Sequence, residues 1–324
     1  MSESSKTIYI IDILRFVACL MIFFYHCNTI LPGEYKFLTF FGNDMGNNLF
    51  FMISGFSLCP SIAVTPVKNI HRWYFKRLRK ILPLLAAAYI LSYLLGYYSL
   101  SDPSQLAAVF IYPTLYWFAT GILVFYLIMF LFMKIKSKPV RVLILVPLFL
   151  LWVMRLNTVE SYYFIGFISM ASGCMLREGL EEIPGEKAGP GIIIAVLAFA
   201  AYMFCKGRIF SGSELTALSV ATGVFVIVSG CAALYAGYAG NQALEKFFSE
   251  KRSLAGVIRY TGNLALPVYL VQCFGFGILG YTIGERIKFP LSFLVNFLLV
   301  WGLAIAAERL QALVVKAVTR RGRE

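Results

Sequence analysis

Long runs of apolar residues alternate with short polar gaps along the whole chain. A helix needs roughly 20 mostly apolar residues to cross a hydrocarbon layer about 30 Å thick. Because lipid offers backbone groups no partners, and no series of alternating strands is present, the pattern predicts an all-α, polytopic transmembrane helical bundle of about ten helices. The ten predicted spans are residues 8–30, 45–64, 81–98, 114–133, 140–156, 161–177, 190–206, 216–238, 257–280 and 289–315.

The composition supports a membrane protein. Of the 324 residues, 60% are hydrophobic and 14% charged, and the mean hydropathy is +0.77. A soluble domain carries about 25% charged residues, and it could not bury this much apolar surface at this length. Disordered, coiled-coil, collagen-like and disulfide-scaffold proteins are excluded too. We expect one integral membrane domain over residues 1–324, in the plasma or inner membrane, with its first apolar run retained as a helix.

Basic residues indicate the orientation. Of the 29 Lys and Arg residues, 20 are assigned to one side of the predicted spans and 6 to the other, and the remaining three, Arg15, Arg259 and Arg309, lie inside predicted spans. The positive-inside rule therefore predicts that both termini face the cytoplasm. The net charge of +13 is spread over these short gaps, so we expect no nucleic-acid partner. The seven cysteines show no metal-ligand spacing, which favours packed core thiols and no metal site.

Three ionisable residues interrupt the first apolar run: Asp12, Arg15 and His26. Each costs about 2.5–3.5 kcal/mol near the centre of a span, so each needs a partner or a purpose. Asp12 and Arg15 are three residues apart and can pair on a helix. Arg15 and His26 are eleven apart, which places them on one face, roughly 16 Å apart along the axis. The alternative is an interfacial ion pair plus a hydrogen-bonded histidine.

His26 is the candidate catalytic base. Histidine has an unperturbed pKa near neutrality, which suits it to take a proton from a hydroxyl and return it to a leaving group. The other histidine, His71, lies in a basic stretch where we expect it to be solvated.

A basic loop is predicted from Lys68 to Lys80, before Pro83 opens the third span. It is either a topology determinant that attracts anionic lipid or a grip for phosphate groups. In the second span, Ser54 and Gly55 permit close approach of a neighbouring helix or of a ligand.

Several motifs together resemble the integral membrane acyltransferase family 3, whose members have about ten transmembrane helices. The first is Asp12-x-x-Arg15 followed by ten residues and His26. The others are Phe50-Phe51-Met52-Ile53-Ser54-Gly55-Phe56, Phe75-Lys76-Arg77-Leu78-Arg79-Lys80-Ile81-Leu82-Pro83 and, more loosely, Leu115-Tyr116-Trp117-Phe118.

The resemblance implies O-acyl transfer, usually of acetyl, from cytoplasmic acetyl-CoA or another acyl-CoA to a hydroxyl of an envelope glycan or glycolipid. On that mapping His26 is the base or an acyl relay, and Arg15, with Asp12 beside it, supports it. Arg77 and Arg79 would bind or orient the CoA. We add Lys76, Lys80 and Ser54 as candidate cofactor-binding residues.

One position departs from the family pattern. Many members carry Tyr-Leu-x-His near the end of the ninth helix, where this chain has Tyr269-Leu270-Val271-Gln272. Gln272 can supply only hydrogen bonds, so a mechanism that needs two histidines is in doubt.

Two other classes of function fit charged residues inside helices. A transporter or flippase for a lipid-linked or small polar substrate would use them around a central cavity, although no inverted repeat is visible. A non-catalytic scaffold would use them as an ion-paired seam.

Overall fold

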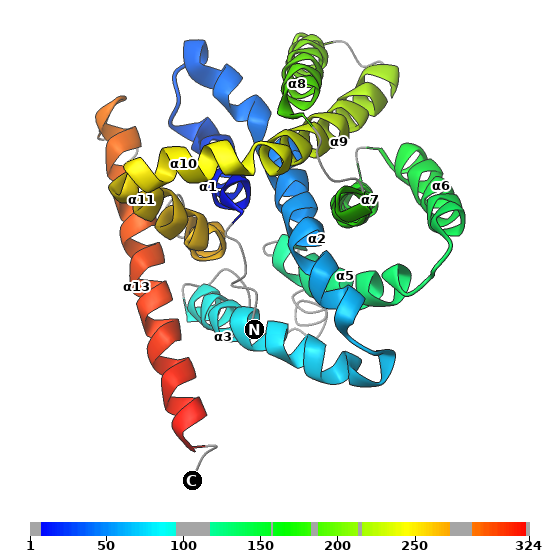
Figure 1. Ribbon diagram of the computed structural model, residues 1–324. Helices are drawn as coiled ribbons and strands as arrows, with labels where there is room; N and C mark the ends of the chain where they lie inside the picture. The colour runs from blue at the N-terminus through cyan, green and yellow to red at the C-terminus, as the bar shows by residue number, and fades with distance from the viewer. Residues whose placement is uncertain are drawn as a thin grey trace. The chain divides into compact units, whose positions relative to one another are not determined.

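The structure, a computed structural model, describes residues 8–94, 117–156, 158–182, 187–212, 216–272 and 287–321. Within these ranges the chain forms helices joined by turns and contains no β-strand, which confirms the predicted all-α class. The α-helices carry the labels of Figure 1: α1 (Tyr9–His26), α2 (Asn47–Val64), α3 (Ile70–Leu94), α5 (Trp117–Met133), α6 (Lys138–Met154), α7 (Val159–Glu182), α8 (Ala188–Phe210), α9 (Thr216–Ala239), α10 (Asn241–Glu250), α11 (Arg252–Asn263) and α13 (Leu291–Arg321).

Shorter helical segments connect some of these helices. Ala265–Gln272 continues after α11, and a π-helical turn leads directly into α2. The π-helical turn is Gly42–Gly46, and 3-10 helices span Cys27–Thr29, Gly33–Phe41 and Val67–Asn69.

Among the described residues, five helical stretches are long and apolar enough to cross a membrane: Tyr9–His26, Gly33–Val64, Ala188–Phe210, Thr216–Ala239 and Leu291–Leu313. Arg252–Asn263 and Ala265–Gln272 pass the same test only when they are taken together, which gives up to six. The protein is therefore a membrane protein with several spanning helices. The ten predicted spans and the cytoplasmic position of both termini stay predictions.

The chain divides into two compact parts. The first part comprises Met1–Tyr25, Phe37–Val64 and Met129–Asn263, and the second comprises His26–Lys36, Thr65–Ile128 and Leu264–Glu324. This division by contacts does not test the prediction of a single acyltransferase domain over residues 1–324, which stays a prediction.

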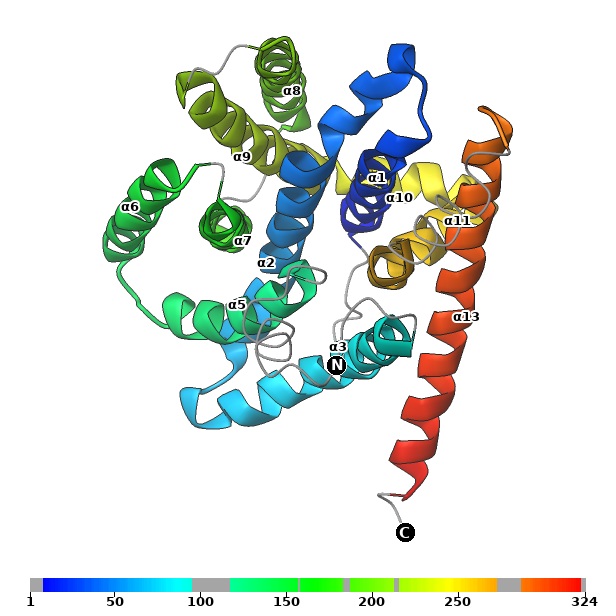
Figure 2. The same cartoon turned by 180° about the vertical axis from the view of Figure 1, so that it is seen from behind.

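The first part is built on two helix pairs. Helix α2 runs along α7, and α8 runs along α9 (Figures 1 and 2). Glycines allow the first pair to touch through their backbones. A Cβ at Gly55 would overlap the Met170 carbonyl of α7, and one at Gly173 would overlap the Met52 carbonyl of α2. The Ser54-Gly55 pair therefore lies where helix packing explains the glycine.

The second part joins α3 to α13 and α5. The Gln311 side chain on α13 donates a hydrogen bond to the Lys80 carbonyl. The Tyr74 hydroxyl donates to the Leu123 carbonyl of α5 at 3.1 Å. Phe118 packs against Tyr269, with ring centroids 5.1 Å apart.

The basic stretch from Lys68 to Lys80 is not a loop, and this prediction was wrong. Helix α3 begins at Ile70 and continues through Pro83. The reason is an apolar stripe at helical spacing, because Trp73, Ile81, Leu84 and Ala88 are all buried. Lys and Arg are good helix formers that keep their charged ends in water, so they do not interrupt such a helix.

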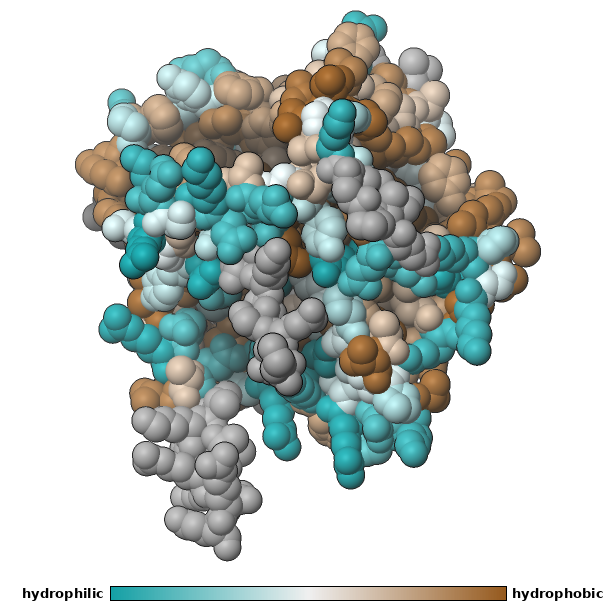
Figure 3. Space-filling view, viewed as in Figure 1, coloured by the Kyte–Doolittle hydropathy of each residue, from teal (hydrophilic) through white to brown (hydrophobic). Residues whose placement is uncertain are grey.

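Hydrophobic side chains cover the outward surfaces of several helices. Leu143 and Leu150 on α6, and Leu197 and Phe204 on α8, are all more than half exposed. In Figure 3 hydrophobic side chains gather over α6, while hydrophilic ones gather over α3. Exposed apolar area of this extent is what a lipid-facing surface requires.

Candidate functional site

Asp12 lies in the first turn of α1, where two arginines approach it. Arg15 Nη1 is 3.9 Å from Asp12 Oδ1, which confirms the pairing that the three-residue spacing predicts. Arg259 Nε on α11 is 3.5 Å from Asp12 Oδ2. The Asp12 side chain is 15% exposed, so a largely buried carboxylate holds two cations that are more exposed.

A glycine brings α11 against α1 at this point. A Cβ at Gly262 would lie 3.0 Å from the Asp12 carbonyl oxygen and 3.5 Å from Arg15 Cβ. The sequence marked Arg259 only as a charge inside a predicted span, and it could not show which carboxylate receives it. The three charged residues together fix the start of α1.

His26 is the last residue of α1 and is half-buried. Helix α1 is continuous from Tyr9 to His26, so the eleven-residue spacing keeps Arg15 and His26 on similar sides of one helix. Arg15 belongs to the first compact part, whereas His26, Arg77 and Arg79 belong to the second. From their place in the sequence we expect these four residues to face one shared cavity, and this expectation stays a prediction.

Helix α3 carries an exposed basic face. Arg72, Lys76, Arg79 and Lys80 are all exposed, and they follow one another at intervals of four, three and one residues. Residues three and four apart are neighbours on a helix surface. We call these four residues the basic face of α3. The helix therefore lines up cations that a loop would have left scattered.

Arg77 is placed differently from the basic face. It is half-buried, and its guanidinium carbon lies 3.7 Å from the centre of the Trp73 ring. Its Nη1 donates to the Trp73 carbonyl at 2.8 Å. A guanidinium stacked on an indole in this way supports the helix. Of the two arginines in the predicted phosphate grip, Arg79 is the exposed one.

Two further candidate residues are polar and lie inside helices. Ser54 is half-buried on α2, one residue before the glycine that touches α7, and its role toward a cofactor stays a prediction. Gln272 is 1% exposed, and neither its Oε1 nor its Nε2 makes a hydrogen bond within the part of the chain that the structure describes. Of the residues discussed above, Leu115 and Tyr116 lie outside the described ranges.

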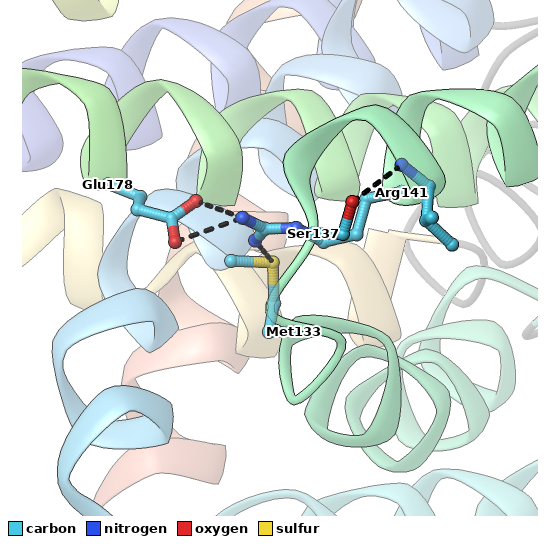
Figure 4. Close-up of polar contacts among 5 residues, drawn as sticks. Met133, Ser137, Arg141 and Glu178 are labelled. Carbon is cyan, nitrogen blue, oxygen red and sulfur yellow. Dashed lines mark hydrogen bonds and ion pairs between the residues drawn. The ribbon is translucent and has the colours of Figure 1, made fainter.

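The structure also shows a buried ion pair that the sequence did not predict. Arg141 on α6 is 1% exposed, and its Nη2 donates to Glu178 Oε1 and Oε2 on α7 at 3.0 and 2.7 Å. Its Nη1 contacts Met133 Sδ at 3.2 Å (Figure 4). In the sequence, Arg141 counts only as one of the basic residues around the start of the predicted span 140–156. Its burial fastens α6 to α7.

The family model described as an acyltransferase domain matches residues 8–308. The chain belongs to the acyltransferase 3 family. It is therefore an acyltransferase. Membership of the family favours this class over the transporter and scaffold alternatives. The match extends from the start of α1 into α13, so it includes both compact parts of this family member. No curated protein and no solved structure matches the chain.

Proposed function

We propose that this acyltransferase moves an acyl group, usually acetyl, from cytoplasmic acyl-CoA to a hydroxyl of an envelope glycan or glycolipid. The observation that carries the donor half of this proposal is the basic face of α3. Membership of the family supplies the reaction class.

The basic face suits the phosphate groups of CoA. The basic face extends over nine residues, from Arg72 to Lys80, which is a rise of about 12 Å along the helix. Cations at this spacing can contact several phosphates at once, and charged hydrogen bonds to phosphate are stronger than neutral ones. Arg77, stacked on Trp73, would hold this part of α3 in shape. Residues of the basic face bind the donor, and Arg77 positions them.

His26 is the proposed base. One imidazole nitrogen takes the proton of the acceptor hydroxyl as its oxygen attacks the thioester carbonyl. A carbon–oxygen bond forms, the carbon–sulfur bond breaks, and the imidazolium returns the proton to the leaving thiolate. General-base help of this kind contributes about 10²–10⁴ in rate. In the relay variant His26 carries the acyl group itself before the hydroxyl receives it.

Arg15 would act with Asp12 at the other end of α1. About 16 Å of helix separates Arg15 from His26, so the charge of Arg15 would act on the site from a distance and not by contact with the thioester oxygen. Asp12 holds Arg15 and Arg259 and would thereby fix the direction of the Arg15 side chain. Arg15 is accordingly the supporting group, and Asp12 is a positioning residue.

The test of His26 uses purified protein in liposomes that hold labelled acetyl-CoA, with a candidate glycan present. We expect His26→Ala to abolish glycan-dependent release of CoA, while the matched His71→Ala variant retains it. His71 is the other histidine of the chain and is exposed on α3. Unchanged turnover in His26→Ala would remove His26 from the site. Acceptor movement without CoA consumption would point to transport.

The test of the donor site removes charge from α3. We expect Lys76→Ala/Arg79→Ala/Lys80→Ala to raise the KM for acetyl-CoA at least tenfold and to weaken its dependence on salt. The matched control is Lys246→Ala/Lys251→Ala/Arg252→Ala, which removes three exposed cations around α10 and α11. Equal KM values in the two variants would contradict the donor site.

A further inference from the structure

A cavity of about 160 Å³, lined by both polar and apolar side chains, lies in the first compact part, where the ends of five elements meet. Its walls come from the turn that enters α2, the end of α6, the start of α7, the end of α8 and the start of α9. A cavity needs only about 10–15 Å³ to hold one water, and whole-ligand pockets measure about 300–1,000 Å³. This cavity therefore has room for one ring or a similar small group.

One wall of the cavity is an ion pair. Lys206 Nζ on α8 donates to Asp44 Oδ2 in the turn before α2. Lys206 is 27% exposed and Asp44 is 30% exposed, and both line the cavity. Each side chain can therefore make further hydrogen bonds to a molecule in the cavity. The ammonium offers donors and the carboxylate offers acceptors. A ligand here meets both kinds of partner side by side.

Fixed polar groups continue this wall. Asn48 is 5% exposed, and its Nδ2 donates to the Asp44 carbonyl at 2.6 Å while its Oδ1 accepts from Ser169 at 3.0 Å. The Thr222 hydroxyl donates to the Leu218 carbonyl at 2.7 Å, which leaves its oxygen as an acceptor. Ser219, which lines the same cavity, adds another hydroxyl. These groups are held in place before any ligand arrives.

Other lining residues are aromatic and apolar. Trp152, 4% exposed, packs directly on Gly223 of α9, where a Cβ would overlap its indole ring. Tyr162 and Ile165 of α7 also line the cavity. The glycine thus makes room for a flat ring that borders the cavity. A lining that combines apolar rings with mixed donors and acceptors fits a ligand with C–H faces and hydroxyl edges.

The charges exclude other ligand classes. Among the described residues that line the cavity, Asp44 carries the one carboxylate and is already paired with Lys206, so these residues lack the charged oxygen ligands that a divalent cation prefers. The lysine is neutralised by Asp44, so a phosphate would gain little from it. A neutral molecule rich in hydroxyl groups matches these partners best.

The turn that carries Asp44 also contacts the last turns of α1. A Cβ at Gly42 would overlap Tyr25, and one at Gly46 would lie 2.6 Å from Ile22 Cγ1. Tyr25 is the residue before His26. The cavity thus lies at the same end of the first part as the C-terminal end of α1.

We propose that this cavity binds one sugar ring of the acceptor, an inference that rests on the proposed transfer to a glycan.

The test measures binding directly. The protein in lipid nanodiscs, free of glycoside detergent, is titrated with the methyl glycosides of glucose, galactose, mannose and N-acetylglucosamine, and binding is followed by saturation-transfer NMR. We expect at least one glycoside to bind and Ser219→Phe, which fills the cavity, to weaken that binding at least tenfold. The matched control Val224→Phe adds the same ring on the outward side of α9, where Val224 is 36% exposed.

The outcomes separate this inference from the proposed function. Binding that is lost in Ser219→Phe and retained in Val224→Phe supports the sugar site even if His26→Ala leaves transfer unchanged. No binding by any of the four glycosides, or equal binding in both variants, overturns the sugar site. Thr222→Val is the milder second variant, and we expect it to weaken binding several-fold without filling the cavity. Retained affinity in Thr222→Val, should Ser219→Phe fail to fold, overturns the proposal as well.

Discussion

At the scale of single residues, the charged residues inside the helices differ in their ion-pair partners and in their burial. Asp12 shares its carboxylate between two partly exposed arginines, whereas Arg141 is almost completely buried and depends on Glu178. Removing one member of a buried ion pair leaves an uncompensated charge, which costs far more than the pair contributes. The exposed fraction of each partner therefore decides which substitution is tolerated.

We predict that Glu178→Leu destabilises the protein by about 3 kcal/mol, because it strands the buried Arg141. Arg141→Met should cost less, since Glu178 is 32% exposed and can be hydrated. The double variant Arg141→Met/Glu178→Leu should recover most of the loss. Thermal unfolding of the four proteins in nanodiscs measures this, and equal losses in the two single variants would contradict it.

Gln272 permits a second prediction at this scale. A buried amide without hydrogen bonds costs about 1–3 kcal/mol. The Gln272 amide makes none with the described residues, so Gln272→Leu should raise the unfolding temperature. If the amide serves the substrate, the same variant should lower acyl transfer. A lower unfolding temperature would show that the amide has a structural partner.

At the scale of elements, the contact between α2 and α7 is sensitive to added side-chain volume, because glycines meet backbone atoms there. We predict that Gly55→Ala and Gly173→Ala each cost about 1–3 kcal/mol, because the added methyl meets backbone atoms that cannot move alone. Gly179→Ala is the matched control on α7. A Cβ there meets nothing within 4 Å, so it should be neutral or stabilising by up to about 1 kcal/mol. Yields of folded protein and unfolding temperatures test all three variants.

The same scale shows what the sequence could predict. The apolar pattern predicted the all-α class, and the i, i+3 spacing predicted the Asp12–Arg15 pair. The pattern did not predict α10, which lies between the predicted spans 216–238 and 257–280. It missed the first three turns of α3, because a dense run of charge was interpreted as a loop although Trp73 and Ile81 continue an apolar stripe. The partner of Arg259 and the cavity beside Trp152 were out of reach, since their residues meet only through tertiary packing.

At the scale of the whole molecule, the helices differ in length. Ala188–Phe210 has 23 residues, or about 34 Å of helix, which exceeds the roughly 30 Å of a typical hydrocarbon layer. Helix α6 covers most of the predicted span 140–156, which stays a prediction, and has only 17 residues, or about 25 Å. Most of its outward side chains are apolar. A bilayer accommodates a short hydrophobic helix by becoming thinner around it.

We therefore predict that transfer is faster in lipids with 14-carbon chains than in lipids with 20-carbon chains. The measurement is CoA release in liposomes of each composition at equal protein content. Lengthening α6 by four leucines after Leu150 should move the optimum toward the longer chains. An optimum that stays in place would show that α6 is not the helix that senses thickness.

The shortness of α6 has one more consequence. A bilayer that is thinner beside α6 and Trp152 would bring the two aqueous phases closer together there. A small acyl group would then cross a thinner hydrocarbon layer. The lipid composition of the bilayer would then regulate the enzyme. Thick regions, rich in long-chain lipids, would lower the rate of acyl transfer, and thin regions would raise it.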